Sequence, residues 1–181
     1  MMASLLFYNL PKIDQIAVNL FYGWGYNFYR LENQLRQDDL LVRSHVSKLL
    51  GLSRGLLEKA QQNYRRVALP PPTRDNPRPT PEALAGAETL ERLSAAVGDL
   101  EGRIRALPVP EDDRMTQRYR QEAETLVALG TCDTRLVGRA QMLFELLQNK
   151  DQVWILTNTA DIEEGFSAIE ATLLERLMVL G

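Results

Sequence analysis

The sequence predicts an all-α protein, in which a helical arm or hairpin precedes an antiparallel helical bundle with coiled-coil-like packing. Apolar residues recur at spacings of three and four through most of the 181 residues, which is the period of an α-helix. Six prolines gather in residues 70–81 and form the clearest boundary. We therefore expect aromatic-rich long helices in residues 1–69, a proline-rich linker in 70–81 and a helical bundle in 82–181.

The ring-rich stretch from residue 20 to residue 35 is the most informative part of the chain. Wound as a helix, it places apolar residues on one side and tyrosines on nearly the opposite side. The apolar stripe consists of Phe21, Trp24, Phe28, Leu31 and Leu35, and the tyrosine stripe of Tyr22, Tyr26 and Tyr29. A surface helix needs only one apolar stripe, so this helix is expected to have neighbours on both sides.

The first 69 residues read as one or two helices. Pro11 is well placed to open a helix, and Asp38 or Asp39 could cap a second one. The second apolar stripe consists of Val42, Val46, Leu49, Leu50, Leu57, Ala60, Tyr64 and Val67. Because residues 37–39 contain neither glycine nor proline, they favour a continuous or gently bent helix over a hairpin.

The linker ends in a strong helix start. Thr80 is a good N-cap, Pro81 suits the first helical position, and Glu82 places an acid in the first turn. A strict heptad seam follows, made of Leu90, Leu93, Val97, Leu100, Ile104 and Leu107. Such a seam fits a two-stranded coiled coil or one helix of an antiparallel bundle, and three heptads favour the bundle.

Three further segments complete the predicted bundle. Acidic residues 111–113 are expected to open a helix that ends near Gly130, and Asp133 is expected to cap the next one. That helix would bury Leu136, Ala140, Leu143, Phe144 and Leu147. Residues 153–156 have some strand character, but a lone strand lacks a partner, so a helix or an apolar connector is expected. The last helix would follow Thr157 and carry Ile162, Phe166, Ile169, Leu173, Leu177 and Leu180.

The charge of the chain is unevenly divided. The net charge of −3 gives no reason to expect binding to DNA or acidic lipid. Residues 1–79 carry 11 Lys/Arg against 6 Asp/Glu, or +5, and residues 80–181 carry 10 against 18, or −8. Two interpretations are open: the halves attract each other, within one chain or between two chains, or the charges only keep the surfaces of the helices solvated.

Catalytic and ligand-binding signatures are missing from the sequence. One histidine, His45, cannot supply a di-iron or zinc site, and no glycine-rich phosphate loop is present. Cys132 is the sole cysteine, which excludes an intrachain disulfide and fits a reducing, cytoplasmic setting. We expect no signal peptide, and because no run of 18 apolar residues is present, we expect no transmembrane helix. We expect no enzymatic activity, no cofactor and no metal.

The leading functional hypothesis is a non-enzymatic scaffold, adaptor or chaperone-like protein that acts through protein–protein contacts, with self-association as a homodimer. Its expected partner-binding residues are Tyr22, Trp24, Tyr26 and Tyr29, because Tyr and Trp are enriched at interface hot spots. A fully buried central helix is the competing interpretation of these residues. Two alternatives are a nucleic-acid-associated helical protein that uses the basic first half, and a helical pocket for an apolar ligand near Trp24 and Phe28.

Overall fold

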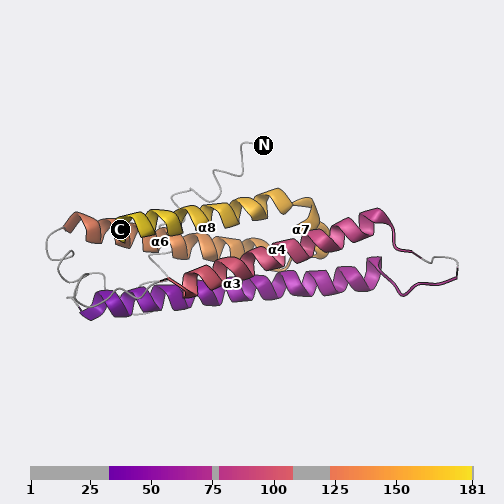
Figure 1. The fold of residues 1–181 in the computed structure, drawn as a ribbon, viewed down its shortest axis with the longest axis horizontal. Helices are drawn as coiled ribbons and strands as arrows, with labels where there is room; N and C mark the ends of the chain where they lie inside the picture. Colours follow the sequence, from indigo (N-terminus) through magenta and orange to yellow (C-terminus); the bar gives the residue numbers. More distant parts are fainter. Residues whose placement is uncertain (1–32, 75–77, 108–122, 181) are drawn as a thin grey trace.

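The described part of the chain is all-α, as predicted. The computed structural model describes residues 33–74, 78–107 and 123–180. The helices in these ranges are α3 (Asn33–Ala68), α4 (Pro81–Arg105), α6 (Ala123–Leu147), α7 (Gln152–Thr157) and α8 (Thr159–Leu180). The four long helices lie side by side along one axis, and α7 is a short helix between α6 and α8 (Figure 1). The prediction of a helical bundle is confirmed.

Two antiparallel hairpins make up this bundle. The proline-rich segment joins α3 to α4 at one end, and α7 joins α6 to α8 (Figure 1). Across the hairpins, α3 packs on α6 and α4 packs on α8. Thus α3 and α8 occupy opposite corners, and each has both α4 and α6 as neighbours.

Helix α3 is one continuous rod through residues 37–39. The expected cap at Asp38 or Asp39 is therefore absent, and the preference for a continuous helix holds for the described residues. Six residues of the predicted stripe are buried: Val42, Val46, Leu49, Leu50, Leu57 and Ala60. The stripe ends early, because Tyr64 is half-buried and Val67 is 70% exposed. Val67 lies one turn from the linker, where the partner helix α4 has only just begun.

Helix α4 begins and packs as its sequence predicts. The Thr80 side chain accepts a hydrogen bond of 3.2 Å from the backbone N–H of Ala83, and Pro81 is the first helical residue. The heptad seam lies in the core: Leu90, Leu93, Val97, Leu100 and Ile104 are buried, and Leu107 is half-buried against them. The partner that covers this seam is α3, so the seam is part of a bundle in this chain.

The prediction of a helix end near Gly130 and a helix cap at Asp133 is wrong. The chain does not break at Gly130, and Asp133 caps no helix, because α6 runs without interruption from Ala123 to Leu147. Asp133 is instead buried, and its carboxylate accepts a 2.7 Å hydrogen bond from Nε of Arg176 in α8. The expected core residues Leu136, Ala140, Leu143 and Leu147 are buried, and Phe144 is half-buried.

The segment after α6 is helical, as expected. Asp151 caps α7 by accepting a 2.8 Å hydrogen bond from the backbone N–H of Trp154, and Ile155 enters the core. In α8, Ile162, Phe166, Ile169 and Leu173 are buried. The predicted stripe fails at Leu177, which is 38% exposed, and the side chain of Leu180 lies outside the described residues. The helices predicted from Pro11 and from residues 111–113 also lie outside them.

A pair of glycines in α4 tests the packing of α3 on α4. A Cβ added to Gly86 would lie 2.6 Å from Cζ of Tyr64 in α3, whereas one added to exposed Gly102 would meet nothing within 4 Å. Gly102→Ala should therefore raise the free energy of unfolding by about 1 kcal/mol, the ordinary gain of Ala over Gly in a helix. Gly86→Ala should lose that gain, or become destabilising by about 1 kcal/mol, because it displaces the Tyr64 ring.

The check is urea denaturation of both variants, each also made in a Tyr64→Ala background. Removing the ring should make Gly86→Ala stabilising while leaving the effect of Gly102→Ala unchanged. An equal gain from both glycine substitutions in the wild-type background would show that Tyr64 does not pack on Gly86.

Candidate functional site

The residues predicted to bind a partner, Tyr22, Trp24, Tyr26 and Tyr29, lie outside the described residues. The candidate features of the described residues lie on α3, α4, α6 and α8. Three features stand out there: a hollow between α3 and α4, a buried polar network between α6 and α8, and apolar side chains on the outward sides of α3 and α8.

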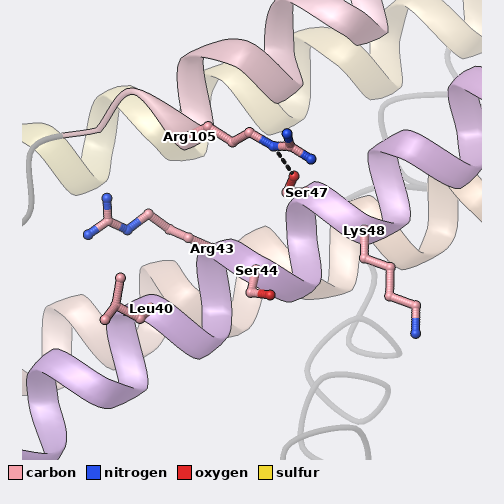
Figure 2. A pocket seen from close by; sticks show the side chains of 6 residues that line it. All are labelled: Leu40, Arg43, Ser44, Ser47, Lys48 and Arg105. Carbon is pink, nitrogen blue, oxygen red and sulfur yellow. Dashed lines mark hydrogen bonds between the residues drawn. The ribbon is translucent and has the colours of Figure 1, made fainter.

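The hollow lies where α3 passes the end of α4. It has a volume of about 610 Å³ and is lined by Leu40, Arg43, Ser44, Ser47, Lys48 and Arg105. Figure 2 shows Arg105 reaching from α4 to Ser47, while Arg43 and Lys48 point away from Ser47 in different directions. Because the cationic groups diverge, they do not enclose a common point at which an anion would be held.

The two arginines of the hollow serve the fold. Arg43 is buried and donates a 2.6 Å hydrogen bond from Nη1 to the carbonyl oxygen of Leu107, just beyond α4. Nε of Arg105 donates to Ser47 Oγ at 2.8 Å, and Ser47 donates to the Glu101 carboxylate at 3.0 Å. Glu101 also forms an ion pair of 2.5 Å with Arg105. These bonds fasten the end of α4 to α3, so the hollow is a helix junction.

His45 lies on α3 beside this junction. It is half-buried, and its Nε2 atom is buried. Burial and the nearby Lys48 ammonium lower the pKa of His45 from 6.5 to about 4. The imidazole is therefore neutral at physiological pH, and the described part of the chain holds no cluster of side chains that could bind a metal ion with it.

The α6–α8 interface holds a buried polar network. Asp133 and Arg176 are both buried and paired, and Nη1 of Arg139 donates to the carbonyl oxygen of Ala168 at 2.6 Å and to the hydroxyl of Thr172. Cys132 is buried beside this network. Burial, together with the carboxylates of Glu175 and Asp133, raises the pKa of the Cys132 thiol. The thiol therefore stays protonated at neutral pH and lacks the character of a nucleophile.

Ion pairs between helices partly follow the predicted attraction between the halves. Arg65 of α3 pairs with Glu91 of α4 at 2.7 Å and so joins the basic half to the acidic half. Two further pairs, Arg92–Glu163 and Arg103–Glu170, connect α4 to α8 within the acidic half. All these side chains are about half exposed, so each pair contributes little to stability but helps to select which helices are neighbours.

Exposed apolar side chains gather on α8 near its C-terminal end. Leu174, Leu177 and Met178 are 45%, 38% and 79% exposed, and their spacing of three and four puts them on one side of the helix. Leu40 and Leu41, near the start of α3, are also exposed and lie at the same end of the bundle (Figure 1). Of the three exposed α8 residues, only Leu177 belongs to the apolar stripe that the sequence predicts to be buried. Leu174 and Met178 lie between the positions of that stripe. They form a second apolar stripe, which the spacing of the sequence could have indicated.

Neither metal ligation nor membrane crossing is indicated by the described residues. They contain no cluster of three His, Cys, Asp or Glu side chains that could hold a metal ion. None of the described helices is both long enough and apolar enough to span a membrane. No protein-family model, curated protein or solved structure matches the chain.

The buried Asp133–Arg176 pair makes a sharp stability test. Asp133→Leu leaves the Arg176 guanidinium buried without its carboxylate, so it should lower the free energy of unfolding by about 3–5 kcal/mol. Adding Arg176→Met should recover most of that loss, because an apolar pair of similar volume fills the site without a charge.

Chemical denaturation of the single and double variants measures both effects. As a control, Glu91→Gln breaks the exposed Arg65–Glu91 pair and should cost less than about 1 kcal/mol. A double variant no more stable than Asp133→Leu alone would show that the pair contributes more than charge compensation.

His45 should make the protein less stable in mild acid. In the unfolded chain the imidazole binds a proton with an ordinary pKa of 6.5, but in the folded chain that pKa is about 4. Between these values the unfolded state binds more protons, so the free energy of unfolding falls as the pH drops from about 6.5 towards 4. The contribution of His45 should be on the order of 1 kcal/mol, since the side chain is only partly buried.

Urea denaturation of wild type and His45→Gln at pH 7.5 and pH 4.5 isolates this contribution, because the carboxylates titrate alike in both proteins. The wild type should lose more stability than the variant over this range. Equal losses would mean that His45 takes up its proton equally well in the folded chain.

Proposed function

We propose that the chain is a non-enzymatic helical scaffold or adaptor, which acts by presenting helix faces to a protein partner or to other copies of itself. The observation that carries the proposal is the row of Leu174, Leu177 and Met178 on the solvent side of α8. Neighbouring exposed apolar side chains on one surface mark protein-contact sites more often than isolated ones do.

The chemistry of the described residues supports a contact function over catalysis. The arginines of the hollow and the buried α6–α8 pair hold helices together, and His45 and Cys132 are both uncharged at neutral pH for the reasons given above. A buried, protonated thiol also suits a reducing compartment, so we include a cytoplasmic location in the proposal.

The predicted pocket for an apolar ligand near Trp24 and Phe28 lies outside the described residues, and the hollow beside α3 is a different site. The hollow beside α3 is lined by five polar side chains and by Leu40 alone among apolar ones. Ligand pockets for apolar molecules are instead lined mostly by aliphatic and aromatic side chains.

Site-specific photo-crosslinking in producing cells tests the proposed function. A photoreactive phenylalanine derivative at position 178 should give covalent adducts with protein, because Met178 lies in the proposed contact surface. The same residue at position 88, which is exposed on α4 and distant from that surface in sequence, serves as the control.

The adduct masses also identify whether the partner is this chain or another protein. Protein adducts from position 178 and few from position 88 are the expected result. If position 178 gives no protein adduct above the control, α8 is not a contact surface and the proposal is wrong.

A further inference from the structure

The outward side of α3 carries a line of basic residues that the bundle does not use. Lys48, Lys59 and Arg66 are all exposed, and their spacings of 11 and 7 residues bring them to nearly the same side of the helix. Exposed Leu41 and Leu52 and the open position Gly55 lie on that side as well. These six residues form the basic face of α3. No described carboxylate pairs with Lys48 or Lys59, and the face contains no acidic residue.

The outward side of α8 has the opposite character. Glu164, Ala171, Leu174, Glu175 and Met178 recur at helical spacings on it, and we call them the acidic face of α8. Oε1 of Glu164 is itself buried and has no hydrogen-bond partner among the described residues, whereas Glu175 is exposed and pairs with Arg135 at 3.5 Å. The face contains no basic residue. It therefore offers the exposed carboxylate of Glu175, the half-buried carboxylate of Glu164 and apolar groups, whereas the basic face of α3 offers cationic groups and leucines.

The two faces match in spacing as well as in charge. Lys48 and Lys59 are 11 residues apart, and so are Glu164 and Glu175. An antiparallel pairing that puts Lys48 opposite Glu175 also puts Lys59 opposite Glu164. In that register Leu52 falls opposite the small Ala171, and Met178 falls opposite His45, between Leu41 and Lys48. A parallel pairing would place Met178 opposite Gln62 and Leu174 opposite Glu58.

These observations identify a second copy of the chain as the occupant of each face. We propose that the acidic face of α8 in one copy binds the basic face of α3 in another copy, with the two helices antiparallel. This contact rests on the proposed function, and its partner is a second copy of the chain. A single copy cannot make this contact, because α3 and α8 lie at opposite corners of the bundle and α4 and α6 separate them.

The corner positions also determine the type of assembly. The contact joins two different surfaces, so after two copies have bound, one basic face and one acidic face remain free at the ends. Copies therefore add in series, and the assembly is an open chain, or a ring where the rotation between copies closes, whose mass grows with concentration. A closed homodimer would instead need one surface that binds itself.

Charge reversal with complementation tests the proposal. Variant A is Lys48→Glu/Lys59→Glu and variant B is Glu164→Lys/Glu175→Lys. Light scattering at low salt should show a wild-type mass that rises with concentration to at least about twice that of the 20.6 kDa chain and falls at high salt. Each variant alone should stay monomeric. An equimolar mixture should regain the concentration-dependent mass, because every A–B contact then joins opposite charges.

Two control variants distinguish the loss of the proposed contact from misfolding and from a general effect of charge. Glu82→Lys/Glu88→Lys reverses two exposed carboxylates of α4 outside both faces and should leave association unchanged. Leu174→Ser/Met178→Ser removes the apolar part of the acidic face without touching the half-buried Glu164, and should also give monomers. Circular dichroism confirms helicity in each variant, and this second variant replaces B if B does not fold.

Several results would overturn the inference. A wild-type chain that is monomeric at every concentration would do so, as would folded A and B variants that fail to associate when mixed. If DNA or anionic vesicles bind the wild type in low salt, and binding is lost in A but kept in B while no self-association is seen, the basic face serves a polyanion instead. Photo-crosslinks from position 178 to a different protein, with no self-association, would remove this inference but retain the proposed function.

Discussion

The packing of α3 on the heptad seam of α4 is the contact on which the rest of the fold depends. Leu90, Leu93, Val97 and Ile104 are fully buried, and Leu50 and Leu57 of α3 are buried in the same core. Burying each such side chain contributes about 1.5–3 kcal/mol relative to exposure, so this seam outweighs any surface ion pair. The linker turns the chain back, and the bonds of Arg43 and Arg105 close the other end of the pair.

The α6–α8 hairpin then fits against the side of the first hairpin that remains apolar. Its own pairing differs in kind, because it buries charge as well as hydrocarbon. The Asp133–Arg176 pair lies within the interface, and the cost of desolvating two ions leaves it close to neutral in stability. The pair instead fixes how α8 is aligned along α6. A shift of α8 by one turn would separate Arg176 from Asp133 and leave both charges buried without a partner of opposite sign.

The features that sequence predicted well are those governed by local rules. Thr80 and Pro81 favour a helix start through contacts within a single turn, and a seam of leucines at heptad spacing favours a covering helix. The mispredicted residues depend on neighbours that are distant in sequence. Asp133 has the composition of a cap, and only the presence of Arg176 in α8 makes it an interior residue. Leu177 continues a regular apolar stripe, but near the end of α8 that stripe loses the cover that buries Leu173.

The candidate contact surfaces were hidden from sequence for a related reason. The spacing of Lys48 and Lys59 is visible in the chain, but so are many other cations, and those at Arg43, Arg65 and Arg105 form bonds within the bundle. Only the fold separates cations that hold helices together from cations that face solvent. It also places α3 and α8 on opposite corners, so their complementary faces cannot satisfy each other within one copy. Charge asymmetry between the two halves of a chain thus has two separate consequences here. Part of it, as in Arg65–Glu91, attaches one helix to the next, and the remainder points outward, where another molecule can meet it.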